Sequence, residues 1–244
     1  MRIMKNIVFI MDIDLGGEGR FASSRRAPYK FSIDSWKHWA SKNNAELFIL
    51  NDLLMSHEDM GICWQRYYLF DILEANNIEY DQIAMVDAEL TEGKFTGVHC
   101  DASYDWVCRS IENYSKHMFE EHKMPFWEYI DCGFMVVNKK HKSFFKDIVN
   151  LYHSNKLAFK EMEKFHVGTD QTPVNILANK NNVDLKLLPY EYNMVDLPRK
   201  ELLADDLLFT NCGWIYQFNC IPNNEENKAT YYWMEKTYKH LYEN

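Results

Sequence analysis

Short apolar runs alternate with helically spaced apolar residues along the first third of the chain. The runs cover residues 7–11, 47–50 and 82–86, and polar residues bound each of them, as in strands buried in a parallel sheet. Between the first two runs, the spacing of Ile33 and Trp36 predicts a helix with Ser32 as its N-cap. Residues 63–75 form a second predicted helix. This alternation predicts an α/β fold with a mostly parallel central sheet flanked by helices.

The second half of the chain has a less regular pattern. We expect helices within residues 103–120 and 144–152, and short strands at 134–137, 185–188 and 207–210. Another helix is predicted to start at Asp170, with Thr169 as its cap and Pro173 in its first turn.

The last predicted helix carries an apolar stripe at positions i, i+3, i+7 and i+10, formed by Tyr231, Met234, Tyr238 and Leu241. Packing in the core or at an interface is the favoured role of the stripe, and membrane-surface contact or acceptor docking is the alternative. No repeat, low-complexity tract or Pro/Ser-rich linker divides the sequence. We therefore expect a single domain over residues 1–244, with 222–244 as a C-terminal helical extension.

Composition and charge narrow the expected partners. The 244 residues carry a formal net charge of −9, which argues against a nucleic-acid partner because phosphate neutralisation needs clustered Lys and Arg. The six cysteines include no C-x-x-C pair and no zinc spacing. The apolar run at 7–11 is too short for a signal-peptide core or a transmembrane span. We expect a cytoplasmic protein with reduced thiols and no transmembrane segment.

Two acids, Asp87 and Glu89, follow the predicted strand at 82–86. Because a strand repeats every two residues, their side chains point the same way, with Cα atoms about 6.6 Å apart. Hard oxygen ligands at this spacing suit a divalent ion such as Mg²⁺ or Mn²⁺. The alternative for D-x-E taken alone is a pair of acids in a solvated loop.

Further polar residues follow or precede the other predicted strands. Asp12 and Asp14 come after the first strand, where acids meet the ribose or base of a nucleotide in α/β proteins. Arg66, on the helix before the D-x-E strand, is suited to a diphosphate or to orienting the metal acids. The nearby glycines do not match G-x-G-x-x-G, which disfavours a dinucleotide site. A second basic group, expected to lie in a solvated loop or face phosphates, consists of Arg20, Arg25 and Arg26.

Two more segments combine a carboxylate with backbone suited to a ligand. Asp131 precedes Gly133 at the entrance of a buried strand, where glycine permits close backbone approach. Asp170 and Gln171 stand at a predicted helix start, where backbone N–H groups point outward.

The order of these segments resembles glycosyltransferases of the GT-A fold, in particular the glycogenin and lipopolysaccharide galactosyltransferase-like retaining group. The resemblance spans residues 5 to 225. Residues 7–14 are similar to the first nucleotide-binding strand of that group, and 87–89 to its D-x-D motif. Residues 130–138 are similar to its N-A-G-hydrophobic-N strand, 170–171 to its D-Q pair and 188–193 to its L-P-x-x-x-N turn.

The resemblance implies a single GT-A (Rossmann-like) domain with three groups of site residues. The nucleotide-binding residues would be Asp12, Asp14, Arg66, Asp87 and Ala88. The ligands to Mn²⁺ (or Mg²⁺) would be Asp87, Glu89 and Gln217. The residues around the transferred sugar, which we class as catalytic, would be Asp131, Asp170 and Gln171.

Two positions depart from the pattern of the group. Gln217 stands where the H-F-N-G motif has a metal-binding His, and Asp131 stands where Asn is usual. A neutral amide oxygen is a weaker anchor for Mn²⁺ than imidazole, and the added carboxylate places negative charge near a diphosphate.

The function implied is metal-dependent transfer of a sugar from a nucleoside diphosphate sugar, specifically a UDP-sugar, to a glycan or small hydroxyl acceptor, with retention of configuration. One alternative is a sugar nucleotidyltransferase of the same fold, although residues 16–26 match its glycine-rich basic signature poorly. The other is a catalytically weak or inactive nucleotide-sugar-binding protein, which the Gln217 and Asp131 departures favour.

Overall fold

A six-stranded sheet forms the centre of the protein in the computed structural model, which describes residues 5–13, 26–85, 95–100, 104–163, 170–218, 221 and 228–243. Its strands are β1 (Asn6–Met11), β2 (Ala45–Leu50), β3 (Gln82–Met85), β4 (Phe95–His99), β5 (Ile130–Asn138) and β6 (Leu185–Leu188). Their order is β2-β1-β3-β5-β4-β6. β1 is parallel to β2 and β3, and β4 is parallel to β6, whereas β5 runs antiparallel to both of its neighbours. The predicted α/β class with a mostly parallel sheet is confirmed.

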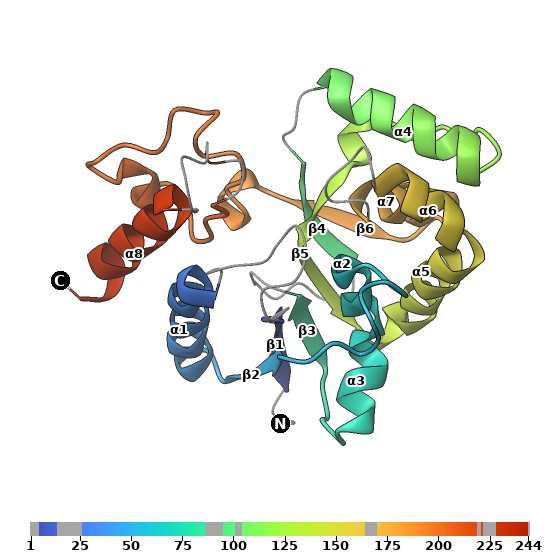
Figure 1. The fold of residues 1–244 in the computed structure, drawn as a ribbon. Coiled ribbons are helices and arrows are strands. Elements are labelled where there is room, and N and C mark those ends of the chain that lie inside the picture. Colours follow the sequence, from blue (N-terminus) through green and yellow to red (C-terminus); the bar gives the residue numbers. More distant parts are fainter. Residues whose placement is uncertain are drawn as a thin grey trace.

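Helices flank this sheet (Figure 1). The described helices are α1 (Arg26–Lys42), α2 (Ile62–Gln65), α3 (Leu69–Ala75), α4 (Tyr104–Met118), α5 (Lys142–Ser154), α6 (Lys156–Glu163), α7 (Gln171–Lys180) and α8 (Lys228–Tyr242). α1 and α8 lie side by side on one side of the molecule, and α3, α5, α6 and α7 lie on the other.

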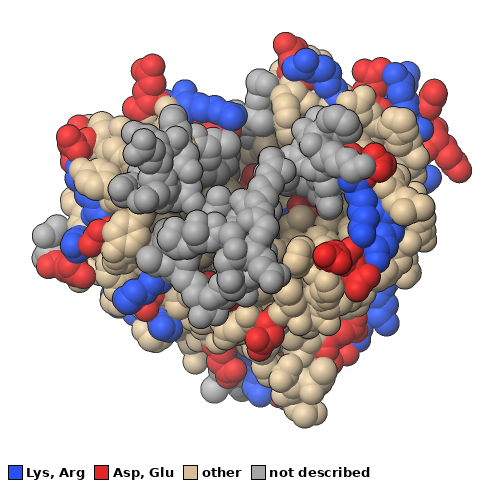
Figure 2. Space-filling model, in the orientation of Figure 1, with Lys and Arg blue, Asp and Glu red and all other residues tan. Residues whose placement is uncertain are grey.

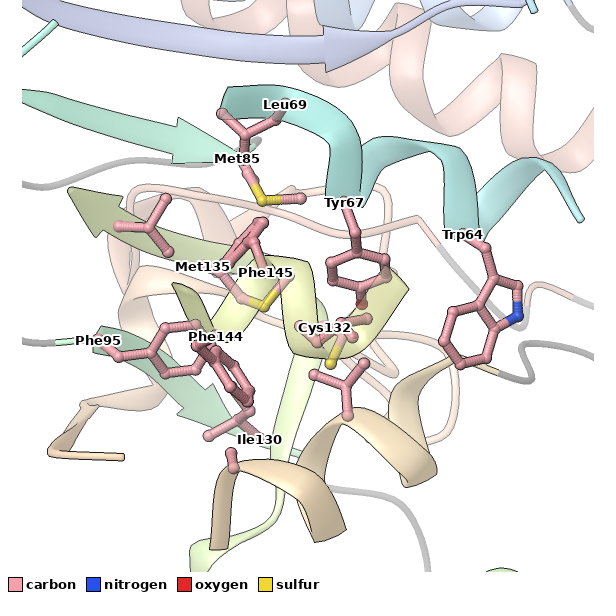
Figure 3. Close-up of a cluster of buried hydrophobic side chains, with 14 of the residues drawn as sticks. Trp64, Tyr67, Leu69, Met85, Phe95, Ile130, Cys132, Met135, Phe144 and Phe145 are labelled. Atoms are coloured by element: carbon pink, nitrogen blue, oxygen red, sulfur yellow. The ribbon is translucent and has the colours of Figure 1, made fainter. Parts of the chain in front are cut away.

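Alternation along the strands divides the core between the two faces of the sheet. Ile7 and Phe9 of β1 belong to the larger cluster, under α2 to α7, whereas Val8 and Ile10 belong to a smaller cluster that also contains Trp36 of α1. Figure 3 shows part of the larger cluster, in which side chains of the helical segment 62–75 meet those of the sheet. Burial of both faces explains why these strands read as continuous apolar runs.

Two local predictions are wrong, and a third is displaced by one residue: α7 begins at Gln171 with Asp170 in the N-cap position, and the predicted cap Thr169 lies outside the described residues. α1 begins at Arg26, so Ser32 lies inside the helix instead of capping it, because Pro28 is tolerated in the first turn and Phe31 packs on Tyr231 and Tyr238 of α8. Residues 207–210 are not a strand. The left-handed conformation of Leu207, with φ of 52°, turns the chain into a 3₁₀ segment at Leu208–Asn211.

The apolar stripe of the last helix packs as expected. Its residues Tyr231 and Tyr238 each place a ring centroid 5.5 Å from that of Phe31 in α1. No helix in the described ranges is long and apolar enough to cross a membrane.

Candidate active site

The candidate site lies at the edge of the sheet where β1 and β3 end. Phe9 of β1 pairs with Met85 at the end of β3, and Met85 pairs with Met135 of β5. Because β5 runs antiparallel to β3, the first residues of β5 lie beyond the end of β3. They are at the same edge of the sheet as the residues that follow β1. Asp131, the second residue of β5, and Asp12, the first residue after β1, therefore share this edge.

Asp131 is the buried acid of this edge, with 6% of its surface exposed. Its Oδ1 atom accepts a hydrogen bond of 2.8 Å from the backbone N–H of Gly133 and one of 3.3 Å from Nδ2 of Asn193. Burial raises the pKa of Asp131, and the Gly133 N–H and the charge of Arg66 oppose that shift. The carboxyl is thus fixed in place and is easier to protonate than an exposed aspartate.

Gly133 lets both this carboxyl and the Gln217 amide approach the backbone closely. A Cβ atom at position 133 would lie 2.6 Å from Asp131 Oδ1 and 2.9 Å from Gln217 Nε2. No side chain fits there without moving one of these groups, which explains why glycine occupies the position. The predicted metal ligand Gln217 and the predicted sugar-site residue Asp131 therefore both lie close to the backbone of Gly133.

Two carbonyl oxygens in this cluster have no hydrogen-bond donor among the described residues. They are Oδ1 of Asn193 and Oε1 of Gln217, and both are buried. An unpaired buried acceptor costs about 1–3 kcal/mol, so the native structure is expected to supply a partner that is a ligand, an ion or water. Together with Asp131, they form a group of oxygen acceptors suited to hydroxyl groups or a hard cation.

Asp170 forms the second half of the site, immediately before α7. Its Oδ2 atom accepts hydrogen bonds from Nη2 of Arg66 and, at 2.9 Å, from the hydroxyl of Tyr67. Both donors come from the 3₁₀ segment Arg66–Tyr68, which interrupts the helix predicted over 63–75. Figure 3 shows Tyr67 reaching from this segment toward β5. Burial raises the pKa of the Tyr67 phenol, which keeps it a donor.

Gln171 fixes the start of α7 against β5. Its Oε1 atom accepts the backbone N–H of Cys132 at 3.1 Å, and its Nε2 atom lies 3.2 Å from Sγ of Cys100. Asn175, one turn later, exchanges two hydrogen bonds with the backbone of Ile130, at 2.8 and 2.9 Å. The D-Q pair therefore has divided roles: the carboxylate joins Arg66, and the amide holds the strand.

The predicted site residues fall into two groups. Asp12, Arg66, Asp131, Asp170, Gln171 and Gln217 lie in the described part of the chain, and the contacts above bring all but Asp12 into one connected arrangement. Asp14, Asp87, Ala88 and Glu89 lie outside the described residues. Within the described ranges, no cluster of three or more His, Cys, Asp or Glu side chains is placed to hold a metal.

Sequence reasoning missed Tyr67 and Asn175. Tyr67 is adjacent to Arg66 in an apolar helical pattern, so it reads as core. Asn175 is a polar residue between the apolar residues Val174 and Ile176, which is a signal for a buried hydrogen-bonding role.

Comparisons with known proteins show a structural similarity without a similarity in sequence. No known family model and no curated protein matches the sequence. The fold is similar to that in the crystal structure of a glycosyltransferase involved in the glycosylation of the major capsid of PBCV-1. The TM-score is 0.56 at 8% identity, over 96% of this chain and 99% of that one. The chain therefore shares the fold of that protein.

Two crystal structures of the glycosyltransferase GlyE from Streptococcus pneumoniae TIGR4, one in the apo form, also align with the chain. The TM-scores are 0.46 and 0.47 at 11% identity, over 94% and 99% of this chain and 60% and 64% of those chains.

The face of the molecule drawn in Figure 2 is hollowed near its middle, beside the atoms drawn in grey. Basic and acidic side chains both line the visible rim of this hollow, so neither sign of charge dominates it.

Proposed function

We propose that the protein transfers a sugar from a nucleoside diphosphate sugar, specifically a UDP-sugar, to a hydroxyl group of an acceptor, with retention of configuration. In this reaction the bond between the anomeric carbon and the diphosphate oxygen breaks, and a bond forms between that carbon and the acceptor oxygen. The departing nucleoside diphosphate takes up the proton that the acceptor hydroxyl loses. The glycosyltransferase fold supports the reaction class.

The observation that carries the proposal is the buried group of oxygen acceptors on Asp131, Asn193 and Gln217. Sugar hydroxyls donate hydrogen bonds, and two of these oxygens lack a donor among the described residues. We propose that Asp131 and Asn193 accept hydrogen bonds from hydroxyl groups of the transferred sugar.

Asp170 is the second carboxylate of the proposed sugar site. The Arg66 and Tyr67 donors hold one of its oxygens, so its position is fixed before a ligand arrives. A preorganised carboxylate stabilises the positive charge that develops on the sugar as the diphosphate departs. Arg66 acts in this proposal as a positioning residue for Asp170.

A divalent cation is part of the proposal. Asp87, Glu89 and Gln217 would hold Mn²⁺ or Mg²⁺, and the bound ion would act as a Lewis acid toward the diphosphate. The unpaired Gln217 Oε1 fits a hard cation as well as it fits a hydroxyl group.

Donor hydrolysis tests the proposal before the acceptor is known. Purified protein is incubated with UDP-sugars and Mn²⁺, and released nucleotide is measured. We expect UDP release that EDTA abolishes, that Asp87→Asn abolishes with little loss of folding, and that Asp170→Asn lowers at least a hundredfold. The matched control is Asp59→Asn, which removes an exposed ion pair with Lys156 and should retain full turnover.

Two outcomes would contradict the proposal. Release of pyrophosphate from a nucleoside triphosphate and a sugar phosphate would identify a nucleotidyltransferase. Stabilisation of the fold by UDP-sugars in thermal unfolding, without hydrolysis or transfer to any acceptor, would identify a binding protein. NMR of the product's anomeric signal then tests retention.

A further inference from the structure

An aromatic cavity lies on the opposite side of the segment that carries Asn193 and Gln217. It is lined by residues of α1 and α8, by Tyr192 and by residues 214–218, and its volume is about 250 Å³. In Figure 1 these elements lie together on one side of the sheet, away from α3 to α7. Aromatic rings from all three parts line it, among them Phe31, Trp39, Tyr192, Trp214 and Tyr238.

The cavity shares its wall with the candidate active site. Tyr192 lines the cavity, and the next residue, Asn193, hydrogen-bonds Asp131. Tyr216 and Phe218 line the cavity, and Gln217 between them lies against Gly133. A ligand in the cavity would therefore be separated from the proposed sugar site by the thickness of one chain segment.

The lining indicates the charge of the ligand. No described residue that lines the cavity is charged. A diphosphate or a sugar acid would lose its hydration there without gaining an ionic partner, which costs several kcal/mol. The cavity is thus suited to a neutral ligand.

One buried hydroxyl group favours a sugar over an alkyl chain as the ligand of the cavity. Thr237 of α8 lines the cavity and is 3% exposed, and its hydroxyl has no hydrogen-bond partner among the described residues. A ligand hydroxyl would satisfy this group, whereas an alkyl chain would leave it unpaired. Aromatic rings offer flat apolar faces to the C–H face of a pyranose. Trp214, 66% exposed and 4.8 Å from Tyr192 between ring centroids, presents such a face at the cavity.

We propose that this cavity binds a neutral sugar residue of the acceptor, stacked on Trp214 and hydrogen-bonded to Thr237. The role as acceptor rests on the proposed glycosyl transfer, but the binding of a neutral sugar does not. A glycan chain bound here would extend from the cavity past residues 192–193 toward the active site.

Saturation-transfer NMR tests the binding without any turnover. The probes are methyl glycosides of glucose, galactose, mannose and N-acetylglucosamine, together with octyl β-glucoside, which offers a sugar and an alkyl chain in one molecule. We expect saturation on the sugar-ring protons. Trp214→Ala should weaken binding about tenfold and Thr237→Val about fivefold. The matched control is Trp127→Ala, because Trp127 is 68% exposed and does not line the cavity.

Three results would overturn the inference: no saturation of any sugar ring by the wild-type protein, equal binding by Trp214→Ala and Trp127→Ala, or saturation of the octyl chain alone. Failure of the proposed function gives a different result, because sugar binding would persist without release of UDP. If transfer is observed, Trp214→Ala should raise the KM for the acceptor about tenfold, whereas Trp127→Ala should leave it unchanged.

Discussion

Replacing Arg66 with Met should destabilise the protein far more than the loss of a surface ion pair would. The side chains of Arg66 and Asp170 are 18% and 5% exposed, so solvent screens their interaction weakly. Without Arg66, the Asp170 carboxylate keeps only the Tyr67 hydroxyl of the two side-chain donors that contact it. Breaking a buried pair on one side costs about 3–5 kcal/mol, against about 0–1 kcal/mol for an exposed pair.

This loss is large enough to measure and small enough to leave a folded population. In a chain of this size 1 kcal/mol shifts Tm by about 2–4 °C, so Arg66→Met should lower Tm by about 6–20 °C. Urea unfolding followed by far-ultraviolet circular dichroism gives the free energy directly. Tyr67→Phe, which removes one hydrogen bond to the same carboxylate, should cost a smaller amount of about 1.5–3 kcal/mol.

A double-mutant cycle separates the ion pair from other effects of losing Arg66. Asp170→Asn removes the carboxylate that pairs with Arg66, so the double variant Arg66→Met/Asp170→Asn should cost less than the sum of the two single variants. A loss below 1 kcal/mol for Arg66→Met, with no coupling, would refute the buried pair. Arg66 would then be free for the phosphate contact suggested by the sequence, and UDP would stabilise the wild-type protein more than Arg66→Met.

Further predictions concern the strand glycines and two buried titratable groups. Gly133→Ala should cost about 1–3 kcal/mol in urea unfolding and abolish donor hydrolysis, because its Cβ would displace Asp131. Gly97→Ala, whose Cβ would meet an apolar side chain, should cost stability alone. Burial raises the pKa of Asp131, so the native state holds its proton longer than the unfolded state. Stability relative to Asp131→Asn should therefore fall as pH rises above about 4 and level off beyond the native pKa. Burial lowers the pKa of His141 from 6.5 to about 4, so acidification through that window should cost about 3 kcal/mol, a loss that His141→Gln should not show.

Local sequence patterns were sufficient to predict most strands of the sheet. Residues 7–11, 47–50 and 185–188 are strands in the structure, and the first two are short apolar runs with polar ends. β4 was not predicted, since its sequence of Phe95–His99 contains a glycine and only one aliphatic residue. Its strand conformation depends on pairing with β5 and β6, which are distant in the sequence.

The connections within the candidate site depend on tertiary structure. Arg66 and Asp170 are 104 positions apart, and no periodicity indicates that they pair. The sequence did identify both residues, through the order of motifs, but it assigned Arg66 to a phosphate or to the metal acids. The structure pairs it with Asp170, from a point where the helix over 62–75 tightens to 3₁₀ geometry at residues 66–68.

The charges of the buried site affect both the binding of the donor and the departure of the diphosphate in the proposed reaction. Among the described residues, the carboxylates of Asp131 and Asp170 face one guanidinium, that of Arg66, so the ionised cluster carries an excess of one negative charge. This excess repels a diphosphate, and the donor is therefore expected to bind together with a divalent cation, each raising the affinity for the other. The same excess attracts the positive charge that develops on the sugar when the diphosphate leaves. A cluster that opposes binding of the free diphosphate therefore favours the transition state over the ground state, which is the condition for catalysis.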